Sequence, residues 1–458
     1  MILGLDCAPP ALVFERYAGS LPHLSALRER GTWGPLRSSE PPITVPAWAC
    51  MTSGRDPGEL GLYGFRNRRR DRSYDLRVAS SKDVRPKRLW ERASDAGLRA
   101  ASLFVPLTAP VTPIRGTMVS CFLSDGSKTF FPPNKAKSFE ERFGPYQSDV
   151  SDFRSDELAR IFDELDGMRT QHFSMAKAVW VEEKPDFMMM VEMGPDRLHH
   201  AAWHHMDPSS ARYVPGNPWE AKARAYYSAL DASVGEMLSV AGDACVMVVS
   251  DHGARSMVAG VALNDLLREL GWLTLLREPD GVEPLRSCVD WSKTRAWAEG
   301  GYYARLFLNV EGREPSGVIP SSKQRAAEDE LATALEAALK PRGIDVRAVR
   351  PREAYAETHG EPPDLMVYLG DLAYRALGTV GHADVVVATN DTGPDGCNHD
   401  WNGIFIGAGP GLEPGGKIEG ASLYDIAPTA LRCLGLDHSD LRGNDLFSGS
   451  HEGSAHNS

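Results

Sequence analysis

The chain has 458 residues, of which 42% are hydrophobic and 24% are charged, and its 50 basic and 62 acidic side chains give a net charge of −12. This composition is typical of a folded globular protein, and the length suits one large α/β enzyme or roughly two to three domains. The negative charge argues against nonspecific binding to a nucleic acid polymer or to an anionic membrane, because both require a basic face. An anionic substrate would therefore need clustered arginines or bound metal ions.

No signal segment or membrane-spanning segment is evident in the sequence. The amino-terminal apolar run ends at Asp6, and the longest other apolar runs, Phe187–Val191 and Cys245–Val249, have only the length of a strand. The 7 cysteines are scattered without a CxxC pair, which disfavours a disulfide framework and a thiolate zinc site. We therefore expect a cytoplasmic protein that does not act on membranes.

Apolar runs of strand length alternate with amphipathic runs of helix length. The expected strands are Ile2–Leu5, Arg99–Val105, Phe187–Val191, Cys245–Ser250, Leu365–Leu369 and Ile404–Gly407. The expected helices are Ala11–Arg30, Thr44–Thr52, Arg88–Ala96, Asp156–Val181, Ala221–Val240 and Leu423–Gly435. This alternation predicts an α/β fold with a mostly parallel central sheet and helices on both faces.

The segment from about Trp291 to Pro363 has a different pattern. It combines an alternating strand, Tyr302–Asn309, with a charged helix, Ser322–Lys340. We expect residues 291–363 to form a small α+β cap that is inserted into a single catalytic domain of residues 1–447. The Gly- and Ser-rich tail of residues 448–458 is expected to be disordered.

Residue types that bind metal ions follow several of the expected strands or lie in a nearby loop. In chain order they are Asp6, Asp196, His200, Asp251, His252 and His399. Each one alone has an ordinary explanation, such as a helix cap or a local ion pair. The carboxyl ends of parallel strands open on one crevice, however, so the whole set should converge there. Carboxylate and imidazole ligands without thiolates suit Zn²⁺ or Mn²⁺, and six of them can supply a two-metal centre.

The segments Ser39–Trp48 and Met51–Gly58 resemble the nucleophile region of the alkaline phosphatase superfamily. The likeness is specifically to its type I phosphodiesterase/nucleotide pyrophosphatase branch. The metal-ligand motifs and the closing stretch Asp425–Thr429 fit the same resemblance, which extends from Met1 to about Phe447. It implies an alkaline-phosphatase-like fold and a phosphoric ester hydrolase that uses two divalent metal ions, with Zn²⁺ preferred and Mn²⁺ as the alternative.

The resemblance also implies a role for each site residue. Thr44 would be the nucleophile, which agrees with its place at the start of an expected helix, where backbone N–H groups favour a phosphoryl oxygen. A divalent cation would lower the pKa of its hydroxyl group. The ligands implied for the two ions are Asp6, Asp251, His252 and the Thr44 hydroxyl for one, and Asp196, His200 and His399 for the other.

The sequence departs from the family pattern after the nucleophile. Leu60 and Phe65 stand where the better-known nucleotide pyrophosphatases have a His and a phosphate-binding Asn. We expect the phosphate contact to come from the adjacent run Arg66–Arg70, for which a solvated basic loop is an equally good interpretation. The candidate substrate-binding residues are Trp48, Phe65 and Arg66.

The preferred function is hydrolysis of a phosphodiester or pyrophosphate bond in a small molecule of the nucleotide or nucleotide-sugar type, through a phosphothreonine. A phosphomonoesterase or phosphomutase of the same superfamily is the alternative, with Arg68–Arg70 and Arg72 as cations for a second phosphate. A non-catalytic binding protein is the alternative from another class, although such a protein would be expected to lack a ligand. A sulfatase is disfavoured because Thr44 cannot become formylglycine.

Overall fold

The computed structural model describes residues 1–69, 71, 73–412 and 414–447. The tail of residues 448–458 that was expected to be disordered lies outside the described residues, as do Arg70 and Arg72. A nine-stranded sheet forms the centre of the larger part of the molecule. In spatial order its strands are β22 (Gly416–Lys417), β2 (Thr32–Arg37), β21 (Asn402–Ala408), β9 (Val246–Val249), β1 (Ile2–Leu5), β8 (Phe187–Glu192), β5 (Ala100–Leu103), β6 (Gly116–Val119) and β7 (Phe130–Phe131).

The middle of this sheet is parallel. Strands β9, β1, β8, β5 and β6 all run in one direction. Strand β21 is antiparallel to both β9 and β2, and β7 is antiparallel to β6 at the far edge. Every residue of β1, β8 and β9 is buried, which explains why these strands are continuous apolar runs rather than alternating ones. The expected α/β fold with a mostly parallel sheet is confirmed.

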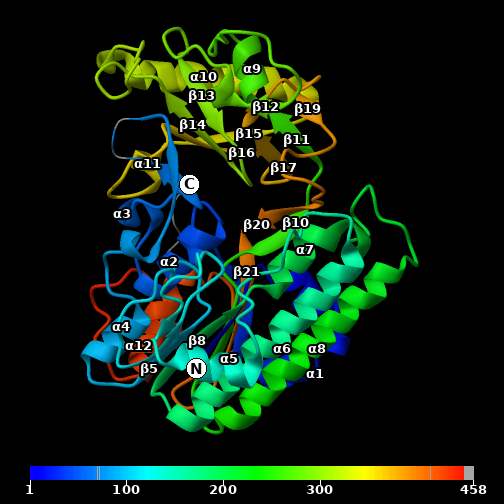
Figure 1. Ribbon diagram of the computed structural model, residues 1–458, viewed down its shortest axis with the longest axis vertical. Coiled ribbons are helices and arrows are strands. Elements are labelled where there is room, and N and C mark those ends of the chain that lie inside the picture. The colour runs from blue at the N-terminus through cyan, green and yellow to red at the C-terminus, as the bar shows by residue number, and fades with distance from the viewer. Residues whose placement is uncertain (70, 72, 413, 448–458) are drawn as a thin grey trace.

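Helices cover both faces of the sheet (Figure 1). One layer contains α1 (Pro22–Glu29), α6 (Leu158–Glu183), α7 (Gly194–Met206) and α8 (Pro218–Ala241). The other contains α2 (Thr44–Ser53), α4 (Leu89–Asp95) and α12 (Ile426–Cys433). The continuous helix expected over Ala11–Arg30 is wrong, because the chain forms a π-helix at Ala11–Arg16 and a 3-10 turn at Ala18–Ser20 before α1. Pro22 lacks an N–H group and favours the first turn of a helix, so a new helix begins there.

A second unit with its own hydrophobic core lies at the other end of the molecule (Figure 1). We call residues 259–387 the cap. Its main sheet has the order β13 (Ala296–Glu299), β14 (Ala304–Leu308), β16 (Leu365–Leu369) and β15 (Val346–Val349), and α9 (Leu263–Glu269) and α10 (Gln324–Leu339) pack on it. A smaller sheet has the order β17 (Tyr374–Leu377), β11 (Ala259–Ala262) and β19 (Val386–Val387).

The cap is larger than the predicted segment 291–363. Its core includes Val261 on one side of that segment and Val385 on the other. The strand Leu365–Leu369 pairs with β14 and β15 inside the cap. A short apolar run has the same appearance in either sheet, so the sequence pattern could not assign this strand to the cap.

Two short antiparallel ribbons lie between the cap and the central sheet. One pairs β10 (Gly253–Ser256) with β20 (Cys397–Asp400), and the other pairs β3 (Arg66–Arg68) with β4 (Leu76–Val78). The second ribbon is attached to the cap by a buried ion pair, in which Arg68 Nη1 lies 2.7 Å from Glu314 Oε1 and the two side chains are 2% and 0% exposed. The ring of Tyr74 also stacks on Trp291, with centroids 3.7 Å apart.

Candidate active site

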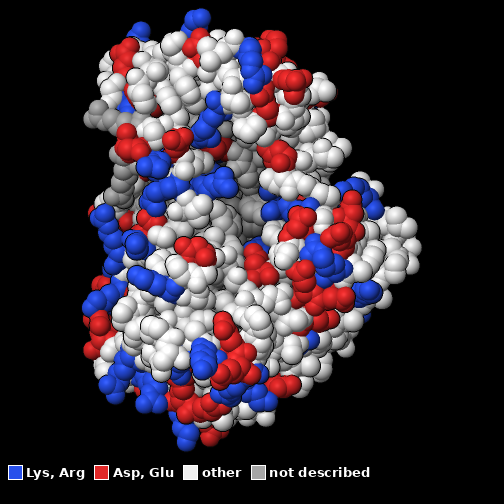
Figure 2. Space-filling view, in the orientation of Figure 1, with Lys and Arg blue, Asp and Glu red and all other residues white. Residues whose placement is uncertain are grey.

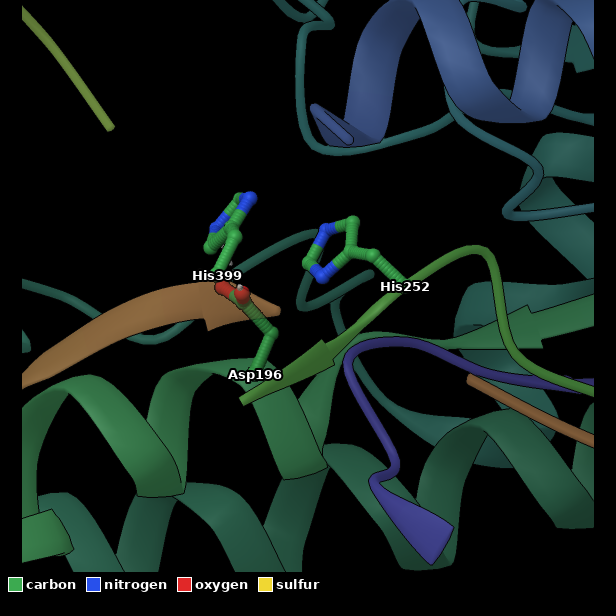
Figure 3. Close-up of side chains that lie close together, drawn as sticks. All are labelled: Asp196, His252 and His399. Atoms are coloured by element: carbon green, nitrogen blue, oxygen red, sulfur yellow. Dashed lines mark ion pairs between the residues drawn. The ribbon is translucent and has the colours of Figure 1, made fainter. Parts of the chain in front are cut away.

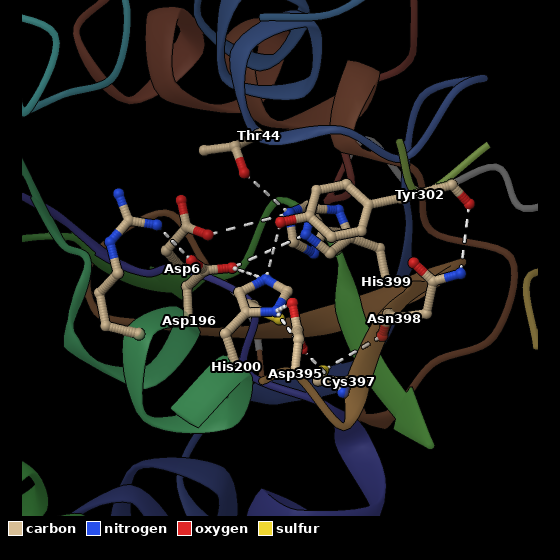
Figure 4. Close-up of polar contacts among 12 residues, drawn as sticks. Asp6, Thr44, Asp196, His200, Tyr302, Asp395, Cys397, Asn398 and His399 are labelled. Carbon is tan, nitrogen blue, oxygen red and sulfur yellow. Dashed lines mark hydrogen bonds and ion pairs between the residues drawn. The ribbon is translucent and has the colours of Figure 1, made fainter. Parts of the chain in front are cut away.

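The three carboxylates expected to bind metal ions lie just after three adjacent parallel strands, and Figure 4 shows two of them, Asp6 and Asp196, beside His200 and His399. Asp6 follows β1, Asp196 is in the first turn of α7 after β8, and Asp251 follows β9. Because β8, β1 and β9 are neighbours in the sheet, these three carboxylates meet at one edge. His399 lies on β20 rather than in the expected loop, and it pairs with Ala254 of β10, two residues after His252. All of these residues are buried.

Each of the three carboxylates has one oxygen held by a hydrogen-bond donor and one oxygen without a hydrogen-bond partner. The latter are Asp6 Oδ1, Asp196 Oδ1 and Asp251 Oδ2, and ring nitrogens lie near them, with His200 Nε2 3.3 Å from Asp196 Oδ1 and His252 Nε2 3.1 Å from Asp251 Oδ2. A buried carboxylate oxygen without a donor is costly, so a missing positive group is indicated here. The donors to the other oxygens are the Trp48 indole for Asp6 (2.6 Å), the Arg197 guanidinium for Asp196 (2.6 Å) and the Cys7 backbone N–H for Asp251 (3.2 Å).

The histidines His200, His252 and His399 are each anchored through one ring nitrogen. In each ring Nδ1 faces an oxygen acceptor, which turns Nε2 toward the centre of the site. The Nε2 atom of His399 has no hydrogen-bond partner, and Asp196 Oδ1 lies 3.7 Å from it. The acceptors for Nδ1 are Asp395 for His200 (3.1 Å), the Gly253 carbonyl for His252 (3.1 Å) and the Pro42 carbonyl for His399 (2.8 Å). This orientation is typical of histidines that bind metal ions.

These atoms form two overlapping clusters that could each hold an ion. One consists of Asp6, Asp251 and His252, and the other of Asp196, His252 and His399 (Figure 3). Burial, followed by the neighbouring carboxylate Asp196, raises the pKa of Asp6 well above its ordinary value. Burial, followed by Asp6, does the same to the pKa of Asp251. A divalent cation would remove this repulsion, so the donor set, which contains no thiolate, fits Zn²⁺ or Mn²⁺.

His200 is placed differently from its expected grouping. Its Nε2 atom lies 3.3 Å from Asp196 Oδ1, but it also lies 2.9 Å from the hydroxyl group of Tyr302. Burial disfavours the charged imidazole, yet Asp395 and Asp196 outweigh that effect and raise the pKa of His200. His200 therefore reaches the second cluster through Asp196, with the Tyr302 hydroxyl on the same ring nitrogen.

Thr44 is the first residue of α2 and lies over the metal-binding residues (Figure 4). Its hydroxyl oxygen is 3.2 Å from Nε2 of His252, and its side chain is buried. Helix α2 ends at Gly54, which has a φ of +64°, a conformation that favours glycine. The N-terminus of a helix carries unpaired N–H groups and partial positive charge, so Thr44 lies where a phosphoryl group can bind.

A network of residues that the sequence analysis did not identify supports His200. Tyr302 enters from the cap, and its ring stacks on His399 with centroids 3.6 Å apart. Arg154 donates to Asp395 (2.9 Å) and to the Tyr302 hydroxyl (2.7 Å). Arg375 donates to Asp395 from 3.2 Å. No local motif marks these residues, because they come from three segments that only the fold brings together.

A pocket of about 510 Å³ lies between the cap and the catalytic part, beside the metal-binding residues. Figure 2 shows a hollow on this face, with Lys and Arg side chains on both sides of it. Phe65 and Arg66 line the pocket, as expected for substrate-binding residues, together with Tyr302. Trp48 does not line it, because its side chain is 0% exposed and donates to Asp6. Of the three candidate substrate-binding residues, Trp48 therefore lies against Asp6 rather than along the pocket.

The part of the chain that the structure describes contains no helix long and apolar enough to cross a bilayer.

Comparisons with known proteins show the family and the fold of the chain. The family model of type I phosphodiesterase/nucleotide pyrophosphatase matches residues 1–401. The fold is similar to phosphonoacetate hydrolase from Sinorhizobium meliloti 1021 in complex with phosphonoformate (TM-score 0.60, 17% identity, 94% of each chain covered). It is also similar to human ectonucleotide pyrophosphatase/phosphodiesterase 5 (TM-score 0.58, 12% identity, 97% of this chain and 96% of that chain covered).

An inactive variant of the murine form of the latter protein, in complex with AMP, has a TM-score of 0.59 at 12% identity and the same coverage. No curated protein matches the chain by sequence. The structural likenesses show the fold, and the family model covers most of the chain. The chain therefore belongs to the type I phosphodiesterase/nucleotide pyrophosphatase family and is a phosphoric ester hydrolase.

Proposed function

We propose that the protein hydrolyses a phosphodiester or pyrophosphate bond of a small molecule, of the nucleotide or nucleotide-sugar type, with Thr44 as the nucleophile. The observation that carries this proposal is the set of buried atoms without hydrogen-bond partners around the Thr44 hydroxyl: three carboxylate oxygens and the Nε2 atom of His399. Such a set has no structural use without cations, and a hydroxyl group next to it is placed to attack a phosphoryl group.

The residues would hold two divalent ions, with Zn²⁺ as the preferred metal. Bound there, the ions would lower the pKa of the Thr44 hydroxyl and offset charge on the phosphoryl and leaving oxygens. The remaining roles belong to the chain. Trp48, Arg197 and the Cys7 N–H keep each carboxylate turned so that its second oxygen faces the centre. The ligands proposed for the two ions are Asp6, Asp251, His252 and Thr44 for one, and Asp196, His200 and His399 for the other.

Thr44 would accept the phosphoryl group in the first step and lose it to water in the second. In the first step the Thr44 hydroxyl loses its proton to water, the Oγ1–P bond forms, the bond from phosphorus to the leaving oxygen breaks, and the leaving group departs with its electron pair. In the second step water attacks phosphorus and loses a proton, the Oγ1–P bond breaks, and Oγ1 takes up a proton from solvent, which regenerates the threonine. The N-terminus of α2 stabilises the negative phosphoryl oxygens in both steps.

The lining of the pocket favours an esterified organic group on the phosphorus. Phe65 and Phe122 form an edge-to-face pair, with centroids 6.1 Å apart, and both line the pocket. Aromatic walls suit a base, a sugar or a similar organic group. The complexes of the structural relatives with phosphonoformate and with AMP also support a small substrate that contains phosphorus. The arginines of the same pocket favour the second candidate, a phosphomonoesterase or phosphomutase, because a monoester carries more negative charge.

The test compares bis-p-nitrophenyl phosphate with p-nitrophenyl phosphate at saturating metal. We expect a higher kcat/KM for the diester, whereas a monoester preference above about tenfold, or roughly 1.4 kcal/mol, would favour the second candidate. Thr44→Ala should lower kcat by about a thousandfold or more while two metal ions remain bound. Thr44→Ser should keep part of the activity, and Thr52→Ala in the same helix serves as the control. Near-normal turnover by Thr44→Ala would remove Thr44 from this role.

A further inference from the structure

Two arginines in the pocket have no acidic partner among the residues that the structure describes. Arg66 is on β3 and Arg305 is on β14 of the cap, and both line the pocket. Arg305 is only 8% exposed, and its Nη1 atom donates to the backbone carbonyl of Arg66. Arg66 is exposed, whereas the guanidinium group of Arg305 is held in a mostly buried position without a carboxylate, which is costly unless an anion binds there.

The other three arginines of the pocket each have an acidic partner. Arg197 pairs with Asp149 (2.6 Å) as well as with Asp196. Arg154 and Arg375 share Asp395, at 2.9 and 3.2 Å. These three arginines hold Asp196 and Asp395 in place, and each of their guanidinium groups pairs with a carboxylate of the protein.

The acidic residues of the pocket do not neutralise Arg66 and Arg305 either. Glu299 pairs with Arg286 outside the pocket, with 2.6 Å between the charged atoms. Asp391 accepts hydrogen bonds from the Thr379 hydroxyl (3.0 Å) and the Gly378 N–H (3.3 Å). The pocket therefore retains an excess of positive charge, in a protein whose net charge is −12.

The position of these two arginines relative to the reaction follows from the lining of the pocket. The same pocket is lined by Ile43, directly before Thr44, and by Tyr302, whose hydroxyl lies 2.9 Å from His200. A volume of about 510 Å³ holds a small organic molecule. A substrate with its phosphorus at Thr44 can thus extend through the pocket to Arg66 and Arg305.

We propose that Arg66 and Arg305 form a subsite for a second anionic group, a carboxylate or a phosphate, on the part of the substrate away from the reacting phosphorus. The planar guanidinium group donates two parallel hydrogen bonds to either anion, which accounts for arginine rather than lysine at both positions. This inference rests on the proposed function only in placing the reacting phosphorus at Thr44. The substrate would then be a phosphate ester with two separated anionic groups.

Binding of non-hydrolysable probes tests the subsite without any turnover. Calorimetry on the metal-loaded protein would compare methylphosphonate with ω-carboxyalkyl phosphonates and with α,ω-bisphosphonates of increasing chain length. We expect one chain length at which the second anion tightens binding at least tenfold. Arg66→Gln and Arg305→Gln should each remove most of that gain and weaken the binding of methylphosphonate far less. The carboxylate and phosphonate series then tell which anion the subsite prefers.

Matched variants keep this test decisive. Arg69→Gln, on an exposed arginine that pairs with Asp71, should behave like the parent. Arg305→Lys keeps the charge and should retain part of the gain if Arg305→Gln folds poorly. If methylphosphonate binds and no second anion improves binding at any length, the subsite is wrong and the proposed function stands. If methylphosphonate fails to bind while a bisphosphonate binds in a manner that depends on Arg66, the subsite stands and the placement of phosphorus at Thr44 is wrong.

Discussion

The two ends of the pocket differ in how their charges are arranged. At the metal end, acidic and imidazole side chains converge, each is anchored on one side, and three carboxylate oxygens have no hydrogen-bond partner on the other side. At the cap end, Arg66 and Arg305 line the pocket without an acidic partner among the described residues. The metal end therefore offers negatively charged acceptors to cations, and the cap end offers positively charged donors to an anion. A metal-bound substrate with two anionic groups would satisfy both ends.

The origin of the two ends also differs. The metal end is built from residues at the carboxyl ends of β1, β8 and β9, so the central sheet itself brings them together. The cap end is built from β14 and from the β3 ribbon, which the buried pair Arg68–Glu314 attaches to the cap. We infer that the sheet fixes the chemistry and the cap selects the substrate. Substitutions at each end of the pocket test this division of roles.

The largest effect is expected from His252→Ala at the metal end. His252 belongs to both clusters and also lies 3.2 Å from the Thr44 hydroxyl, so its loss should disturb both ions and the nucleophile. We expect kcat/KM to fall by about a thousandfold or more, which is roughly 4 kcal/mol, and the bound metal per chain to fall with it. Elemental analysis and kinetics measure this, with His205→Ala on α7 as the control. Full metal content and full activity in His252→Ala would contradict the assigned centre.

A smaller effect is expected from Asp395→Asn, because Asp395 positions His200 and does not touch the substrate. Burial favours the protonated acid, but His200, Arg375 and Arg154 outweigh it and hold the pKa of Asp395 well below its usual range. The neutral amide would weaken the hold on Nδ1 of His200, so metal affinity should fall by about 10- to 100-fold. Added metal should restore activity in part, and the exposed Asp384→Asn should match the parent. Loss of activity that added metal does not restore would exclude a positioning role.

The smallest effect is expected from Tyr302→Phe, at the boundary between the two ends. The ring would still stack on His399, and only the hydroxyl that contacts His200 and Arg154 is lost. A single hydrogen bond contributes about 1 kcal/mol, so kcat/KM should fall by about three- to tenfold. Tyr303→Phe, whose hydroxyl donates to a backbone carbonyl, is the matched control. A fall in kcat/KM above about a hundredfold would show that the Tyr302 hydroxyl takes part in the reaction. The cap would then contribute to the chemistry, which contradicts the division of roles between the sheet and the cap.

Most of the central sheet and the residues of the two candidate metal clusters could be predicted from the sequence, because their signals are local. An apolar run that ends in Asp6 or in Asp251-His252 marks both a buried strand and the side chain at its end. Tyr302 and Asp395 could not be predicted in this way, because they reach His200 only through the packing of the cap and the loop before β20. The place of Trp48 could not be predicted either, because nothing in its neighbourhood in the sequence shows that an indole N–H meets Asp6.

The run Arg66–Arg70 shows the same limit. In the sequence it is a single basic run, and the two interpretations, a phosphate contact or a solvated loop, treat all its members alike. In the structure Arg66 lines the pocket, Arg68 is buried against Glu314, and Arg69 is exposed beside Asp71. The environment of each arginine depends on a partner far away in the chain, so the run cannot be divided by its own sequence.

The stereochemical course at phosphorus tests most directly whether Thr44 is the nucleophile, because it reports on the number of displacements at phosphorus. A diester made chiral at phosphorus with sulfur and oxygen isotopes would be hydrolysed by the metal-loaded protein, and the configuration of the product would be determined by NMR. Attack by Thr44 followed by attack by water inverts phosphorus twice, so we expect net retention. Net inversion would mean that water attacks the substrate directly, and would contradict the phosphothreonine and the role of Thr44 in this account.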